Sequence, residues 1–73
     1  MELFYYPECP YCHKVRQYLA SRDLELPLLN AHEEENAERL QELGGKLQVP
    51  ALLHDGEILY ESDDIIDYLE EAL

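Results

Sequence analysis

The feature that most constrains this chain is the CPYC sequence at residues 9–12, which follows the apolar run at residues 3–6. The apolar run predicts a buried strand over residues 2–6, which the Pro-Glu pair after it ends. Pro10 suits the first turn of a helix, where its missing N–H costs nothing. We therefore expect a helix to begin at Pro10, with Cys9 at its N-cap and Cys12 in its first turn.

The two cysteines of this motif are expected to differ. Cys12, Val15 and Leu19 recur at helical spacing in the predicted helix, which runs to about Ser21, so Cys12 heads its buried stripe. Cys9 lies at the exposed helix end, where unpaired N–H groups and the helix dipole favour a thiolate. Because the thiolate is the nucleophile of thiol–disulfide exchange, the pattern predicts Cys9 as the catalytic nucleophile. Cys12 is then the resolving thiol, and the pair forms a redox disulfide.

The rest of the chain alternates strand and helix signals. Further strands are predicted at residues 24–29, 50–54 and 57–60, and further helices at residues 33–43 and from Ser62 to Leu73. The element order is then β-α-β-α-β-β-α in one α/β domain, residues 1–73.

Local signals mark where these elements begin and end. Pro27 suggests that the second strand lies at a sheet edge, and Gly44-Gly45 stop the second helix. Asp55-Gly56 is a two-residue hairpin signal. Ser62 is a good N-cap for the last helix.

Charge and cysteine content exclude several function classes. The chain carries 17 acidic and five basic residues among 73, a formal net charge of −12. Nucleic acid and anionic membranes both require a basic patch, so neither is an expected partner. Two cysteines and three histidines, without a second CxxC, make a four-ligand zinc site improbable, so we expect no metal. No signal peptide or membrane span is apparent, so we expect a cytoplasmic location.

Two segments resemble a known family. Residues 9–13, Cys-Pro-Tyr-Cys-His, resemble the dithiol glutaredoxin motif, and Gln48-Val49-Pro50 resembles the segment that carries a cis-proline opposite the active site in glutaredoxins and other thioredoxin-fold proteins. The resemblance implies a thioredoxin-like (glutaredoxin) fold with a four-stranded mixed sheet. It also implies a cis bond before Pro50, and a Val49 backbone that pairs with bound glutathione or peptide.

A third segment, residues 61–64, resembles the one that holds the γ-glutamyl end of glutathione. By this resemblance Ser62 meets the carboxylate and Asp63 meets the ammonium group. A helix N-terminus also binds carboxylates on general grounds, although Ser62 and Asp63 serve equally well as simple helix caps. With all three segments together, the implied glutathione-binding residues are Tyr11, Val49, Pro50, Ser62 and Asp63.

The chain departs from the glutaredoxin pattern in two places. Glutaredoxins usually carry a lysine three residues before the first cysteine, where this chain has Tyr6. They also carry Gly-Gly where this chain has Tyr60-Glu61. Glu61-Ser62 with Ile65 instead resembles the N-terminal domain of glutathione S-transferases and their glutaredoxin-like relatives. Both resemblances still point to glutathione.

The leading hypothesis is a glutathione-dependent thiol–disulfide oxidoreductase. It would act as a monomer on protein disulfides or glutathione mixed disulfides, with glutathione as co-substrate and no tightly bound cofactor. One alternative is a redoxin that receives electrons from thioredoxin reductase, for example to serve ribonucleotide reductase. Tyr6 in place of lysine keeps this alternative open, and the match at Ser62-Asp63 stands against it. Another is a non-catalytic module like a detached transferase N-terminal domain. A third is an iron–sulfur carrier, which Pro10 and Tyr11 between the cysteines disfavour.

Overall fold

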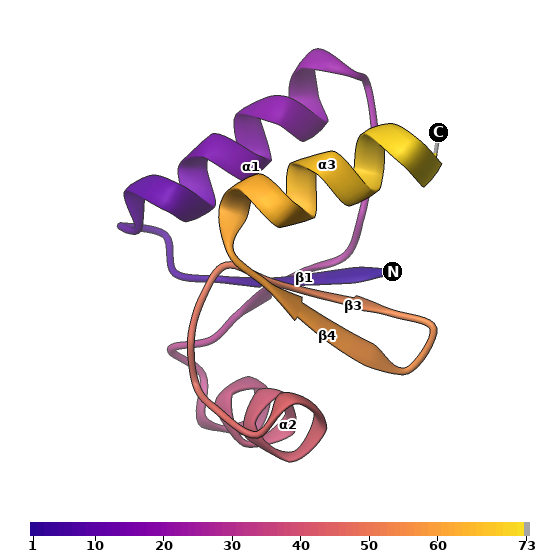
Figure 1. Cartoon of the computed structure of the whole chain (residues 1–73). Helices are drawn as coiled ribbons and strands as arrows, with labels where there is room; N and C mark the ends of the chain where they lie inside the picture. Colours follow the sequence, from indigo (N-terminus) through magenta and orange to yellow (C-terminus); the bar gives the residue numbers. More distant parts are fainter. Residues whose placement is uncertain (73) are drawn as a thin grey trace.

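Residues 1–72, the part of the chain that this computed structural model describes, contain four strands and three helices (Figure 1). Their bounds are β1 Glu2–Tyr5, α1 Pro10–Ser21, β2 Leu28–Asn30, α2 Glu34–Gly44, β3 Ala51–His54, β4 Glu57–Tyr60 and α3 Ser62–Ala72. The predicted order β-α-β-α-β-β-α is confirmed. Leu73, which the sequence places in the last helix, lies outside the described residues.

The strands form one mixed sheet in the order β2-β1-β3-β4. β1 runs parallel to β2 and antiparallel to β3, so that Leu3 pairs with Leu28 on one side and with Leu52 on the other. α1 and α3 cover one face of the sheet, and α2 covers the opposite face (Figure 1). This is the thioredoxin-like α/β arrangement that the sequence predicts.

The core lies on both faces of β1. Successive residues of a strand point to opposite faces, so Leu3 packs under α1 and α3 while Phe4 packs against Leu40 of α2. Both side chains are completely buried. Burial on both faces explains why the first strand is a continuous apolar run rather than an alternating one.

The prediction for β2 was wrong at its start. Residues 24–27 were expected in the strand, but pairing begins at Leu28. Pro27 has no N–H to donate to a neighbouring strand, and its carbonyl accepts a hydrogen bond from Leu3 N at 3.0 Å. The extended segment before Pro27 runs beside α1 instead. β2 lies at the sheet edge, as Pro27 indicated.

The turn signals are confirmed. Gly45 ends α2 in the left-handed conformation, with φ 88°, and its N–H donates to Gln41 O. Asp55 and Gly56 both have positive φ, 48° and 79°, in the hairpin between β3 and β4. Such a turn matches the twist of the flanking strands. None of the described helices is long and apolar enough to cross a membrane.

A close contact ties the segment before β3 to β4. The Tyr60 hydroxyl donates a hydrogen bond of 2.8 Å to the Lys46 carbonyl, and the Tyr60 ring passes directly over Gly44. A Cβ atom at position 44 would lie 2.0 Å from that hydroxyl oxygen and 3.1 Å from Ile58 Cβ. Glycine is therefore required at the last residue of α2 for Tyr60 to reach Lys46.

We predict that Gly44→Ala destabilises the protein by about 1–3 kcal/mol, the usual cost of overpacking. Tyr60→Phe loses the hydrogen bond but removes the closest atom, so the two substitutions together should cost less than the sum of their separate effects. Urea unfolding of the four proteins measures this coupling. If the double variant loses as much free energy of unfolding as the two single variants together, Gly44 is not needed for this contact.

Candidate functional site

Cys9 caps the N-terminus of α1, as its spacing from Pro10 predicted. Its backbone is extended, with φ −78° and ψ 120°, and Pro10 is the first helical residue. The Cys9 sulfur accepts a hydrogen bond from the Cys12 N–H at 3.2 Å, while the Cys9 carbonyl accepts one from His13 N at 2.9 Å. A thiolate at this position gains both from that N–H and from the positive end of the helix dipole.

Cys12 lies one turn deeper and is fully buried. The pKa of its thiol is raised to about 12, mainly by burial and then by the hydrogen bond and the charge of the adjacent Cys9. Both cysteines are free thiols in this structure. At neutral pH the two sulfurs are therefore unlike, because Cys12 keeps its proton while the half-buried Cys9 lies closer to solvent.

The loop before Cys9 is held by the segment that leads into α2. The His32 ring stacks on Tyr6 with 4.2 Å between centroids and 15° between planes. His32 Nε2 lies 2.6 Å from Glu8 Oε2. The pKa of Glu8 is lowered, first by a hydrogen bond from its own backbone N–H and then by His32. Sequence reasoning missed His32, since nothing in the sequence links it to Glu8 or Tyr6.

A groove of about 350 Å³ lies beside the motif. Its lining brings together three separate segments, with Tyr11 from α1, residues 48–50 from the segment before β3, and residues 61–63 from the start of α3. All five residues predicted to bind glutathione line this one groove. Neither cysteine lines it, but Tyr11 lies between them in the chain. The Val49–Pro50 peptide bond is cis, as the resemblance implied.

The prediction for the start of α3 needs one correction. Ser62 was expected at the N-cap, but it is the first helical residue and only 8% exposed. Glu61 takes the N-cap position, because its carbonyl accepts the first helical hydrogen bond from Ile65 N at 3.0 Å. Glu61 has a positive φ of 75°, a conformation that sequence alone does not signal in a glutamate.

Gln48 and Glu61 also line the groove, although the sequence analysis did not include them among the binding residues. Gln48 Nε2 donates a hydrogen bond to Glu61 Oε1 at 3.1 Å. This contact joins the segment before β3 to the turn before α3 across the groove. Both residues belong to the segments that resemble the glutaredoxin pattern, and this is the sequence signal that could have found them.

The charge of the groove is negative. Asp63 pairs with Lys14 of α1, and both side chains are more than half exposed. No lysine or arginine is among the described residues that line the groove. Arg16 and Lys46, two other candidate cations, lie over the rings of Tyr5 and Tyr60. The acidic rim suits an amino group rather than a second carboxylate.

Among the described residues, no cluster of three or more histidine, cysteine, aspartate or glutamate side chains is placed to hold a metal ion.

Comparisons with known proteins place the chain in a family. Residues 3–73 match the family "Glutathione S-transferase, N-terminal domain". The chain is 33% identical over 64 residues to a probable glutathione transferase from Aplysia californica, a match that covers 88% of this chain and 70% of that protein. The chain belongs to the glutathione S-transferase N-terminal domain family.

A solved structure shows the same fold. Glutathione S-transferase 1-6 from Anopheles dirus species B superposes with a TM-score of 0.82 at 26% identity over 99% of this chain. The chain spans only 35% of the length of that transferase. The family and fold are therefore shown over nearly the whole chain, while the larger enzyme extends well beyond the matched part.

The raised pKa of Cys12 predicts a loss of stability at alkaline pH. Below pH 9, the ordinary value, the thiol is protonated in both the folded and unfolded states. Between pH 9 and about 12 the unfolded chain releases this proton while the folded protein keeps it, so the free energy of unfolding falls as pH rises. In this range the free energy of unfolding falls by at most about 1.4 kcal/mol for each pH unit.

Urea unfolding at pH 8 and pH 10 under reducing conditions tests this. From pH 8 to pH 10, the free energy of unfolding should fall by about 1 kcal/mol more in the wild type than in Cys12→Val, which has nothing to ionise at that position. Equal losses in the two proteins would contradict the assignment. The difference between the two proteins removes the contributions of tyrosine and lysine titration.

Proposed function

We propose that this chain is a glutathione-dependent thiol–disulfide oxidoreductase of the dithiol glutaredoxin type. The observation that carries the proposal is the unlike pair at the N-terminus of α1. Cys9 Sγ accepts the Cys12 N–H at 3.2 Å, and the buried Cys12 remains a thiol. Such a pair suits stepwise exchange, in which one sulfur attacks first and the other follows.

The reaction begins at Cys9. Its thiolate attacks one sulfur of a substrate disulfide, forms a mixed disulfide, and releases the other sulfur as a thiolate that takes up a proton. Cys12 then loses its proton and attacks the Cys9 sulfur, so the second substrate sulfur leaves as a thiol and a Cys9–Cys12 disulfide remains. Two glutathione molecules reduce this disulfide and become oxidised glutathione.

The structure supplies a reason for this order. Two of the effects that raise the pKa of Cys12 are the hydrogen bond and the charge of Cys9. Once Cys9 is bonded to substrate, its charge is gone, and the pKa of Cys12 falls. The second thiol therefore becomes easier to ionise when its attack is needed. Burial still opposes ionisation, which keeps Cys12 inactive in the free enzyme.

The groove beside Tyr11 is the proposed site for glutathione. Family membership supports a glutathione-related role, and the groove presents what a γ-glutamyl group requires. The N-terminus of α3 offers free N–H groups to the carboxylate, and Asp63 offers an anion to the ammonium group. Val49, whose backbone would pair with bound glutathione, lines the same groove.

One observation favours a second candidate, a redoxin reduced by thioredoxin reductase. Tyr6 stands where glutaredoxins carry a lysine, and no described cation lines the groove to meet the glycyl carboxylate. His32, stacked on Tyr6, is already paired with Glu8. Weak glutathione binding would leave the same dithiol dependent on a flavoprotein reductase. The electron donor distinguishes the two candidates.

The first test is reduction of a glutathione mixed disulfide with glutathione, glutathione reductase and NADPH. We expect turnover in the wild type. Cys9→Ser should lose activity by about a hundredfold or more, because it lacks the nucleophile. Cys12→Ser should retain activity, since glutathione can itself release the Cys9 adduct. Turnover only with thioredoxin reductase would support the second candidate. No redox turnover with either donor would favour a non-catalytic module.

A matched pair of substitutions tests the glutathione site. Asp63 lines the groove, whereas Asp64 is its exposed neighbour in the same helical turn and does not. Asp63→Asn should raise the KM for glutathione about five- to tenfold, the value of an exposed charge-assisted contact. Asp64→Asn removes the same charge and should change the KM by less than about twofold. Equal effects would mean that only net charge matters.

A further inference from the structure

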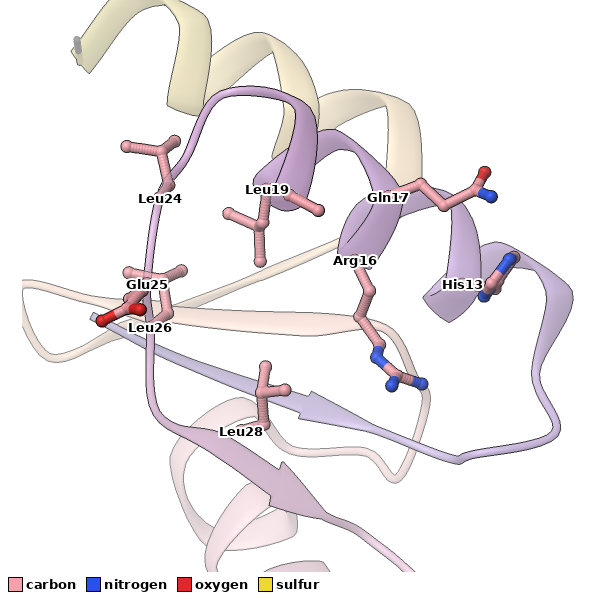
Figure 2. A pocket seen from close by; sticks show the side chains of 9 residues that line it. His13, Arg16, Gln17, Leu19, Leu24, Glu25, Leu26 and Leu28 are labelled. Carbon is pink, nitrogen blue, oxygen red and sulfur yellow. The ribbon is translucent and has the colours of Figure 1, made fainter.

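A second and larger groove, of about 620 Å³, lies between α1 and the extended segment 24–28 (Figure 2). It shares no lining residue with the groove beside Tyr11. Its volume falls within the range of small-molecule sites in proteins, about 300–1,000 Å³. Neither the redox pair nor the proposed glutathione site accounts for this second groove.

The chain builds the apolar part of this groove from alternate residues. Leu24, Leu26 and Leu28 lie two apart, so in an extended segment they share one side. Figure 2 shows them along the segment that runs beside α1, with Leu19 projecting toward them from the helix. Leu28 is 44% exposed although it belongs to the sheet. In a chain with a net charge of −12, such a row of partly exposed leucines is a local apolar surface.

One end of the groove carries a cation without an anionic partner. Lys14, Arg22 and Arg39 form ion pairs with carboxylates. Among the described residues, Arg16 has no such pair despite 17 acidic residues in the sequence.

Arg16 is half-buried as a residue, and an aromatic ring positions its guanidinium. It lies over the Tyr5 ring, 5.0 Å from its centroid, a contact that leaves the N–H groups at its edge available. In Figure 2 it extends toward the level of Leu28, whereas the carboxylate of Glu25 lies beside Leu26, on the side away from Arg16. His13 and Gln17 add polar groups to the rim near Arg16.

We propose that this groove binds a small apolar carboxylate, with its hydrocarbon part against Leu24, Leu26 and Leu28 and its carboxylate on Arg16. The arrangement matches the general pattern of ligand sites, an apolar wall with a few polar groups that set the orientation. Glu25, on the side of the groove away from Arg16, disfavours a ligand with a second anionic group there. The proposal does not depend on the redox function.

Titration of the ¹⁵N-labelled protein with octanoate, followed by NMR at about 150 mM salt to screen the overall negative charge, tests this. Octan-1-ol is the uncharged control. We expect octanoate to shift the amide signals of α1 and residues 24–28, with octanol binding about fivefold more weakly, the value of one exposed ion pair. Shifts beside Tyr11 and Asp63 instead, or no shifts, would overturn the proposal.

Three variants separate the contribution of the Arg16 charge to ligand binding from that of the leucine surface. Arg16→Gln should weaken octanoate binding about fivefold and leave octanol binding unchanged, and Leu28→Ser should weaken both ligands. Arg22→Gln removes a cation that pairs with Glu70 outside the groove, and it should change neither. Unchanged octanoate affinity in Arg16→Gln would overturn the assignment. If the NMR signals of the groove residues shift with protein concentration alone, a second copy of the chain occupies the groove. That result would also overturn the proposal.

Discussion

The hydrogen bond from the Cys12 N–H to the Cys9 sulfur is the contact on which the arrangement of the redox pair depends. It exists because Pro10 starts α1 one residue after Cys9, which leaves Cys9 as the cap for a free N–H. The same helix then carries Cys12 into the core. One local rule of helix termini thus produces both a half-buried sulfur and a fully buried one, and the proposed stepwise exchange uses that difference.

The groove beside Tyr11 depends on long-range contacts instead. Residues 48–50 and 61–63 follow α2 and β4, and they meet Tyr11 because β1 and β3 pair in the centre of the sheet. Two hydrogen bonds hold the segments together, from Gln48 to Glu61 and from Tyr60 to the Lys46 carbonyl. The second of these requires the glycine at position 44. The geometry of the groove therefore also rests on Gly44, Lys46 and Tyr60, which do not line it.

Much of the fold and of the site could be predicted from the sequence, and the physical reasons differ between regions of the chain. Helix and turn signals are local, so the Cys9 cap, the Gly45 stop and the Asp55-Gly56 hairpin were all predicted correctly. The start of β2 was not, because pairing with β1 rather than apolar alternation decides where that strand begins. The stacking of His32 on Tyr6 was missed, since these two residues are far apart in the sequence. The positive φ of Glu61 was missed because a glutamate rarely adopts it. Ser62 was misplaced by one residue because Glu61 takes the N-cap position.

The central claim is that Cys9 reacts first and Cys12 completes the exchange. Intact-mass spectrometry after brief reaction with oxidised glutathione and acid quenching tests it most directly. The account predicts one glutathione adduct on Cys9 in Cys12→Ser, and an adduct in the wild type that converts to the Cys9–Cys12 disulfide. A stable adduct on Cys12 in Cys9→Ser that forms as fast as the adduct on Cys9 would contradict it, because the two sulfurs would then not differ in reactivity.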